Sequence, residues 1–182
     1  MTSPIARAYD DAKKTVQIDP DMARAFEKRI AKNTTYLKHD GVDDHFCVSV
    51  LLVDLVKQRV FLGHHIKSDH WLGAGGHMEP GETPLLTAIR ETKEELGLDL
   101  ADFKLYNLTH FDDVNRNLCR EHFDFFFYHE FDSGHDVKAD PSEFHTATWI
   151  PFEKVLSKKL MPRYRSAIQK LLESFGYSAV EE

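Results

Sequence analysis

Cysteine and long apolar runs are scarce in this chain of 182 residues. Its two cysteines, Cys47 and Cys119, stand far apart and lack the spacing of a zinc site. We therefore expect reduced packing residues, not a disulfide framework or a structural metal centre. No stretch approaches the roughly 20 apolar residues that cross a bilayer, and the N-terminus lacks the apolar core of a secretory signal. These absences predict a cytoplasmic protein that does not enter a membrane.

Positive charge is also in short supply. Lys and Arg number 23 against 30 Asp and Glu, which leaves a formal net charge of −7. A surplus of negative charge disfavours both the nucleic-acid backbone and acidic lipid surfaces. We therefore expect no non-specific binding to nucleic acids and no binding to membranes. The remaining composition is typical of a soluble globular protein, and the length suffices for one well-filled domain with additions.

The most unusual segment is Gly76 to Leu98, which reads GHMEPGETPLLTAIRETKEELGL. Thr83 followed by Pro84 predicts a helix start, because Thr caps helices and proline loses nothing at the first position. Gly97 predicts the end, because glycine readily takes the left-handed conformation that terminates helices. An apolar stripe between these limits is expected to face a core. Its members are Leu85, Ile89 and Leu96, with Thr92 beside them.

Three glutamates share one side of this helix. At about 100° per residue, Glu91, Glu94 and Glu95 fall within an arc of roughly 100°. Arg90 can pair with Glu94 at (i, i+4), whereas Lys93 points away from the carboxylates. A solvated acidic face is the ordinary alternative for such a run. Mutual repulsion argues against it, and so does the preceding glycine-rich loop, which lets a backbone approach a ligand closely. Clustered oxygen ligands suit a hard divalent cation, Mg²⁺ or Mn²⁺.

The spacing of this segment resembles the Nudix box, a pattern with many fixed positions. Those positions are occupied here, without a gap, by Gly76, Glu82, Arg90, Glu91, Glu94, Glu95, Gly97 and Leu98. Thr92 stands where an aliphatic residue is usual, which changes packing and leaves the chemistry intact. The resemblance identifies the chain as a member of the Nudix hydrolase superfamily.

The resemblance implies a function and a set of roles. Nudix hydrolases cleave a diphosphate that links a nucleoside to another group, X, so a divalent-metal-dependent pyrophosphohydrolase is expected, with a nucleotide-type small molecule as substrate. Glu91, Glu94 and Glu95 are then metal ligands, with Glu91 a ligand or the base that activates water. A carbonyl oxygen of the Gly75–Gly76 turn adds a ligand. Arg90 orients the glutamates, and Glu82 braces the loop and reaches a metal through water.

The general base of this superfamily often lies outside the box, and two places are considered. Glu143, in the loop before the strand of Trp149, is the first candidate; an ordinary exposed carboxylate is the equal alternative. His122 and Asp124 alternate with three phenylalanines on a strand, so they share the opposite face. There a hydrogen-bonded pair lining the sheet is favoured over a role in catalysis.

Histidines crowd the approach to the glycine-rich loop. Their spacing does not repeat a zinc pattern, and the glutamates favour harder metals. His65, Lys67 and His77 are candidates for contact with substrate phosphates, and solvated loop side chains are the alternative. Trp71 could stack on a base, although a core position is more typical of such a Trp.

The remaining pattern predicts an α+β protein with a mixed sheet between helices, the α/β/α sandwich that the Nudix resemblance implies. Residues 1–40 form an N-terminal helical extension packed on the core, and residues 41–182 form the Nudix domain. Two helices begin at Ser3-Pro4 and Asp19-Pro20. The expected strands are His45–Leu55, Arg59–Leu62, Phe103–Phe111, Glu121–Phe131 and Thr146–Phe152, followed by a helix with Tyr164, Ile168, Leu171 and Phe175 on one face.

Two alternatives to hydrolysis remain open. A nucleotide-binding or regulatory module without turnover usually loses charged box residues, and none is lost here. An isomerase on the same fold depends on a catalytic cysteine in a distinct motif, and Cys47 lacks those surroundings. The identity of X lies in residues outside the box. A homodimer is an expectation of the resemblance alone.

Overall fold

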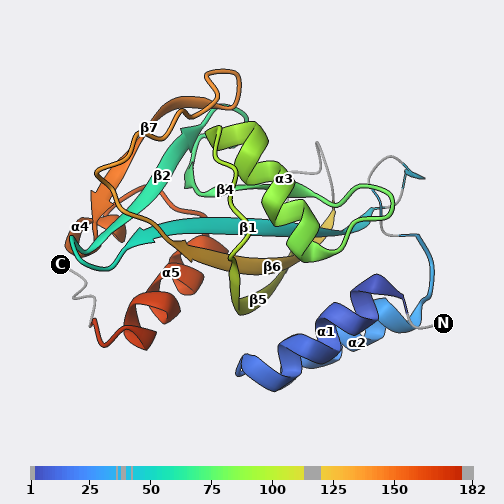
Figure 1. Cartoon of the computed structure of the whole chain (residues 1–182). Helices are drawn as coiled ribbons and strands as arrows, with labels where there is room; N and C mark the ends of the chain where they lie inside the picture. The colour runs from blue at the N-terminus through green and yellow to red at the C-terminus, as the bar shows by residue number, and fades with distance from the viewer. Residues whose placement is uncertain (1–2, 36, 38–39, 42, 113–119, 178–182) are drawn as a thin grey trace.

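A mixed sheet with helices on both faces forms the body of the molecule (Figure 1). The computed structural model describes residues 3–35, 37, 40–41, 43–112 and 120–177. Its helices are α1 Pro4–Thr15, α2 Pro20–Ala31, α3 Pro84–Leu96, α4 Phe152–Val155 and α5 Pro162–Ser174. Its strands are β1 Asp44–Asp54, β2 Arg59–His65, β3 Trp71–Leu72, β4 Ala74–His77, β5 Lys104–Asp112, β6 Glu121–Glu130 and β7 Phe144–Pro151.

The seven strands follow the order β3-β2-β1-β6-β5, with β4 paired to β1 and β7 paired to β2. The central pair β1–β6 is parallel, and the other pairs are antiparallel. This architecture confirms the predicted α+β sandwich with a mixed sheet. Three short elements, β3, β4 and α4, were not predicted, and β7 begins two residues before the predicted strand. The glycines of β4 and the brevity of β3 and α4 leave no periodic pattern to detect.

Helix ends follow the sequence signals closely. The Ser3 hydroxyl accepts a hydrogen bond from the Ala6 amide at 3.1 Å, and the Asp19 carboxylate caps α2. The Thr83 hydroxyl accepts from the Leu86 amide at 3.3 Å, and Gly97 ends α3 with φ at 66°. Side-chain acceptors at the first turn satisfy amides that the helix itself leaves unpaired. The predicted helix starts are therefore confirmed.

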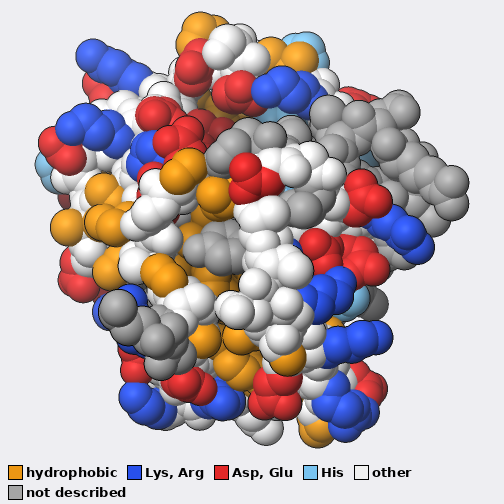
Figure 2. All heavy atoms as spheres, turned by 90° about the vertical axis from the view of Figure 1, so that its right-hand side faces the viewer, with side chains coloured by type: hydrophobic (Ala, Val, Ile, Leu, Met, Phe, Trp, Pro, Cys, Tyr) orange, Lys and Arg blue, Asp and Glu red, His pale blue; other side chains and the backbone are white. Residues whose placement is uncertain are grey.

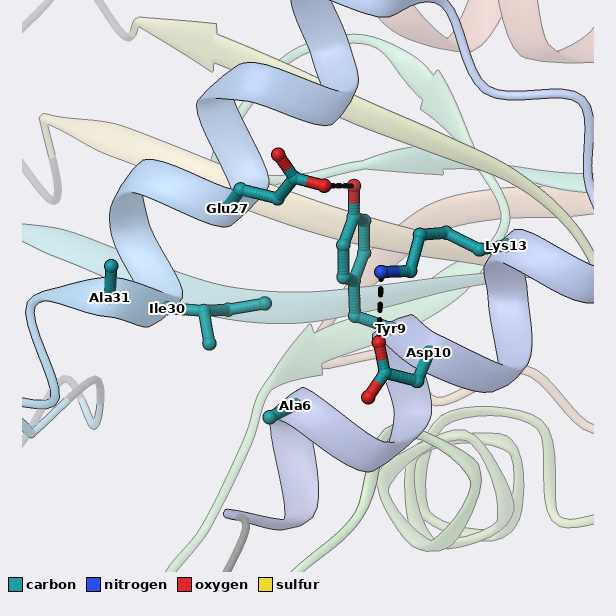
Figure 3. Close-up of a pocket in the computed structure, with 7 residues that line it drawn as sticks. All are labelled: Ala6, Tyr9, Asp10, Lys13, Glu27, Ile30 and Ala31. Atoms are coloured by element: carbon teal, nitrogen blue, oxygen red, sulfur yellow. Dashed lines mark hydrogen bonds and ion pairs between the residues drawn. The ribbon is translucent and has the colours of Figure 1, made fainter.

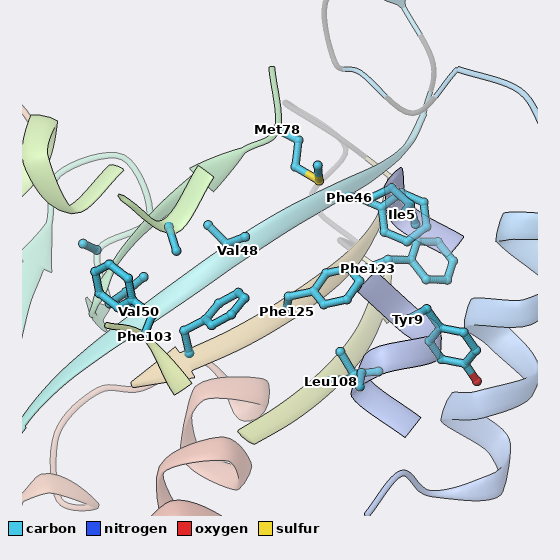
Figure 4. Packing of buried hydrophobic residues seen from close by; sticks show 14 of the residues in the cluster. Ile5, Tyr9, Phe46, Val48, Val50, Met78, Phe103, Leu108, Phe123 and Phe125 are labelled. Carbon is cyan, nitrogen blue, oxygen red and sulfur yellow. The ribbon is translucent and has the colours of Figure 1, made fainter. Parts of the chain in front are cut away.

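Alternation along β6 divides the core into two clusters. Phe123, Phe125 and Phe127 face one side of the sheet, where α1, α2 and α3 also pack. Phe126 faces the other side, against α4 and α5. Figure 4 shows the first cluster, in which aromatic rings from β1 and β6 meet side chains of α1. His122 and Asp124 lie on the second face, as the alternation predicts.

The N-terminal helices are fixed to the sheet by Phe26, which is fully buried. Its ring stacks on Tyr9 with 5.7 Å between centroids and meets the edges of Phe123 and Phe125 at 5.3 and 5.6 Å. Arg29, also buried, reaches the Asp44 carboxylate at the start of β1, with 3.0 Å between Nε and Oδ2. The helices therefore share the core of the sheet.

A shallow pocket of about 200 Å³ lies between α1 and α2 (Figure 3). The Tyr9 hydroxyl donates to Glu27 at 3.3 Å across it, and Lys13 pairs with Asp10 at 2.9 Å. None of its lining residues belongs to the segment Gly76–Leu98. The pocket is thus separate from the glutamate helix.

The buried side of α3 differs from the predicted stripe. Leu85 is 41% exposed, whereas Ala88, Thr92 and Leu96 are buried. Ile89 is partly buried against the first cluster. The helix is rotated because its inward face also carries two glutamates toward β4, so the stripe predicted through Leu85 is wrong at its first position.

Charged side chains of both signs lie on the surface of the molecule (Figure 2). On the face shown in Figure 2, acidic side chains interleave with Lys and Arg, and no block of one sign dominates. In the part of the chain that the structure describes, no helix has the length and apolar character needed to cross a membrane.

Candidate active site

The centre of the site is the contact between β4 and α3. A Cβ atom added at Gly76 would stand 2.2 Å from Oε1 of Glu91, and one added at Gly75 would stand 2.2 Å from the carbonyl oxygen of Val48. Real Cβ atoms do not approach other atoms so closely, because van der Waals repulsion forbids it. A side chain at position 75 would therefore collide with the backbone of β1, whereas one at position 76 would displace the Glu91 carboxylate.

Two carboxylates turn inward onto this strand. Glu91 and Glu95 are only 9% and 8% exposed. The Gly75 amide donates a hydrogen bond to Oε2 of Glu95 at 3.0 Å. Burial raises the pKa of Glu95 to about 8, because a carboxylate loses its hydration there. Burial also raises the pKa of Glu91, although the neighbouring Arg90 opposes the shift.

Arg90 connects three of the glutamates. Its Nε donates to Oε1 of Glu82 at 2.7 Å, and its Nη1 donates to Glu91 at 2.8 Å and to Glu94 at 3.0 Å. Its Nη2 donates to the His77 carbonyl at 3.0 Å. These hydrogen bonds, led by those to Glu82, raise the pKa of Arg90, which stays charged. The guanidinium thus fixes the loop to the helix.

Glu82 is the loop anchor of this network. Besides Arg90, its carboxylate accepts from the Glu79 amide at 2.9 Å and from the Thr87 hydroxyl at 2.8 Å. Burial alone would raise the pKa of Glu82, but the hydrogen bonds from Arg90, Glu79 and Thr87 lower it overall. The Thr87 contact was not anticipated from the sequence, since no spacing rule marks a threonine within an apolar helix face.

The third glutamate lies apart from the inward pair. The Glu94 side chain is 60% exposed and reaches only Arg90 among the contacts above. Of the three carboxylates predicted to share one side of the helix, those of Glu91 and Glu95 are therefore buried, and that of Glu94 lies at the surface. Among the described residues, no three Asp, Glu, His or Cys side chains converge as a set of metal ligands. The donors present, carboxylate and carbonyl oxygens, are nevertheless those that Mg²⁺ and Mn²⁺ prefer.

A second group of predicted residues meets beside Glu95. The Lys67 ammonium lies 3.0 and 3.1 Å from the two oxygens of Glu143, and Nε2 of His65 lies 3.4 Å from Oε2. Burial lowers the pKa of His65, while Glu143 partly opposes that effect. The charges of Glu143 and Lys67 both act on the pKa of Glu95, in opposite directions. The fold therefore brings together residues that are about 75 positions apart in the sequence.

His77 has its ring on the other face of the sheet. Ring centroids lie 5.2 Å from His45 and 5.5 Å from His122, and only its carbonyl reaches Arg90. Its contact with a substrate phosphate stays a prediction. Asp124 is buried on this face too, where it accepts from the Ser49 hydroxyl at 2.7 Å. No hydrogen bond between His122 and Asp124 is present in the described contacts.

The ring of Trp71 is half-buried against the second core cluster. It stacks on His64 with 5.6 Å between centroids, and the Lys158 ammonium lies 4.8 Å from its centroid. One side of the Trp71 ring thus packs on the core, and its exposed part contacts the Lys158 ammonium.

Comparison with known proteins gives the family of this chain. The model of the NUDIX domain family matches residues 44–171. Curated relatives match over shorter stretches: the asymmetrical bis(5'-nucleosyl)-tetraphosphatase of Sus scrofa is 60% identical over 30 residues, which cover 16% of this chain and 20% of that protein. The Mus musculus enzyme is 44% identical over 36 residues, 20% of this chain and 24% of that protein. The matched stretch thus spans about a fifth to a quarter of these relatives.

Solved structures resemble the fold over most of the chain. The E. coli dihydroneopterin triphosphate pyrophosphohydrolase has a TM-score of 0.63 at 16% identity and covers 71% of this chain and 95% of its own. A C. elegans Ap4A hydrolase has a TM-score of 0.59 at 17% identity, covering 72% and 97%. Identities this low show the fold alone. Because the family model matches well over half of the sequence, residues 44–171, the chain belongs to the Nudix superfamily.

Proposed function

We propose that this protein is a divalent-metal-dependent pyrophosphohydrolase that cleaves a nucleoside diphosphate linked to another group, X. One observation carries the proposal: Glu91 and Glu95 are buried on one face of α3 against the glycines of β4, and burial raises the pKa of both. Burying two carboxylates is costly unless a cation compensates them. Carboxylates whose pKa is raised by burial are characteristic of functional sites.

The oxygen donors fit a hard cation, Mg²⁺ or Mn²⁺. Glu91 and Glu95 would hold it, together with the carbonyl of Gly75 or Gly76 on β4 and with Glu94 once that side chain leaves Arg90. Such an ion, when bound, neutralises charge on the phosphate oxygens and favours ionisation of water. Arg90 keeps the helix and loop in register, and Glu82 holds Arg90.

The proton of the attacking water requires an acceptor. We assign this role to Glu143, whose charge already acts on Glu95 across the site. Glu143 takes a proton from water, an oxygen–phosphorus bond forms, and the bridging phosphorus–oxygen bond breaks to give two phosphate products. His65, at 3.4 Å, orients the Glu143 carboxylate.

A panel of substrates tests the proposal. Purified protein is incubated with nucleoside triphosphates, dinucleoside tetraphosphates, nucleotide sugars and coenzyme-linked diphosphates, with Mg²⁺ or Mn²⁺, and the phosphate products are quantified. Dinucleoside tetraphosphates are included because the curated relatives carry that name. We expect turnover of at least one class, lost with EDTA and in Glu95→Gln.

A control variant isolates the site. Lys93 is 62% exposed on the same helix and pairs with Asp99 at 3.1 Å, away from the buried glutamates. Lys93→Met should keep full turnover. Folded Glu95→Gln that still turns over as fast as the unmodified protein would overturn the assignment. Absence of turnover in a protein that binds Mg²⁺ would instead support a binding module.

A further inference from the structure

The predicted base forms an ion pair with a lysine. Lys67 donates to both oxygens of Glu143, at 3.0 and 3.1 Å, so the carboxylate is engaged on its two acceptor atoms at once. The ammonium therefore occupies the edge of the carboxylate at which a water molecule would otherwise bind and give up its proton. If Glu143 acts on water, the ion pair has to open first.

The two partners of this ion pair differ in freedom. The Lys67 side chain is 60% exposed, on a stem with four rotatable carbons. Glu143 is only 25% exposed, and its backbone is tied to the loop, since the Glu143 carbonyl accepts from the Ile66 amide at 2.8 Å. Lys67 is therefore the member that can swing away without disturbing the site.

His65 keeps Glu143 in place when Lys67 leaves. Its Nε2 lies 3.4 Å from the carboxylate, and its Nδ1 accepts from the Ser68 amide at 3.1 Å. The accepted hydrogen bond at Nδ1 places a proton on Nε2, directed toward Glu143, in the neutral ring. A neutral imidazole N–H at this distance orients one oxygen of the carboxylate and leaves the second oxygen available.

We propose that Lys67 is a positioning residue that exchanges partners: it pairs with Glu143 in the empty site and with a substrate phosphate in the complex, which releases Glu143 for the water. This inference rests on the proposed function. A diphosphate carries more negative charge than one carboxylate, so it competes favourably for the ammonium. The base would thus be released only when a phosphorylated substrate is bound, which limits metal-assisted attack in its absence.

A binding cycle tests the exchange without turnover. The unmodified protein, Lys67→Met, Glu143→Gln and the double variant are titrated by calorimetry with a methylene-bridged nucleoside triphosphate, in EDTA. Glu143→Gln should bind the analogue about two- to fivefold more tightly, because it removes the ion pair that competes for Lys67. This factor corresponds to the stabilisation that an exposed ion pair usually provides. In the Lys67→Met background the same change should alter binding by less than half as much on a logarithmic scale.

If the effects of the two substitutions on analogue binding are additive, the inference is overturned. Repulsion between the Glu143 carboxylate and the analogue's phosphates would then explain the effect of Glu143→Gln. A loss of affinity in Glu143→Gln would also overturn the inference. Circular dichroism and thermal melting confirm that each variant is folded; should Lys67→Met fail to fold, Lys67→Gln replaces it. Lys93→Met, with its matched exposure and its own carboxylate partner, should leave analogue binding unchanged.

Steady-state kinetics with Mg²⁺ supply an independent readout. Lys67→Met should raise KM about tenfold or more with kcat within a factor of about three, because the base is already free in its complex. Glu143→Gln should lower kcat by about a hundredfold or more, as expected for loss of a general base. Equal losses of kcat in the two variants, with KM unchanged, would refute the exchange. Lack of turnover in the unmodified protein would reject the proposed function and leave the binding cycle interpretable.

Discussion

Replacing Glu95 by glutamine should stabilise the metal-free protein while it removes the proposed activity. Glu95 is 8% exposed, and burial raises its pKa from 4.5 to about 8. The unfolded chain titrates near the lower value. The folded state therefore prefers the protonated acid, and its contribution to stability is fully present below pH 4.5 and is lost as the pH rises through about 8.

The magnitude follows from the same two values. In the unfolded chain Glu95 is ionised above about pH 4.5, whereas in the folded chain it stays protonated up to about pH 8. Between pH 4.5 and pH 7, about two and a half pH units, this difference costs the folded state about 1.4 kcal/mol per unit. Glu95 thus lowers the free energy of unfolding by about 3 kcal/mol relative to acidic pH, and Glu95→Gln avoids this cost. For a chain of this length the gain corresponds to a rise in Tm of about 6–12 °C. The amide oxygen of glutamine can still accept from the Gly75 amide.

Thermal melts in EDTA between pH 5 and pH 8.5 measure the effect. The difference in Tm between Glu95→Gln and the unmodified protein should grow steadily with pH. Glu94→Gln serves as the control, because that side chain is 60% exposed and carries no burial cost. With Mg²⁺ present, the unmodified protein should have a higher Tm than Glu95→Gln, because Mg²⁺ should bind and stabilise the unmodified protein but not that variant. A Tm difference that stays constant with pH, or an unmodified protein that is the more stable at pH 7 without metal, would refute the reasoning.

Other perturbations give further expectations. Mg²⁺ affinity, measured by calorimetry, should rise with pH through about 8, because Glu95 has to lose its proton before it binds a cation; a flat profile would contradict this. Arg90→Lys should lower the free energy of unfolding in urea by about 2–4 kcal/mol, since lysine cannot make the branched contacts. Gly76→Ala should abolish turnover by displacing Glu91, with unchanged rates as the contrary result. Phe26→Ala should cost about 3–5 kcal/mol in the same urea assay; a loss below about 1 kcal/mol would show that the N-terminal helices are not part of the core.

Local signals explain why so much of α3 could be predicted. Its cap, its stop and its hydrogen bond between Arg90 and Glu94 all lie within one helix, where spacing determines geometry. The rotation of the helix could not be predicted, because it depends on the contact with β4, a strand without a hydrophobic pattern. Leu85 consequently lies at the surface, and Glu94 is separated from its two neighbours.

Long-range contacts limit what a sequence reveals about the rest of the site. Glu143 and Lys67 were considered separately, and nothing in their local sequence indicates that they form an ion pair. That contact depends on the pairing of β2 with β7, which places residues 65 and 144 side by side. The buried contact between Ser49 and Asp124 arises in the same way, from the parallel pairing of β1 with β6.

The packing of Phe26 on Phe123 and Phe125 has a consequence for synthesis of the chain. The N-terminal helices leave the ribosome before β6, the strand that completes their core, which follows about 100 residues later, roughly 5–20 s at ordinary rates of translation. Helices of 12 residues are marginal alone in water. During that interval the apolar faces of the two helices have no native partner. They can therefore aggregate until β6 emerges and covers them.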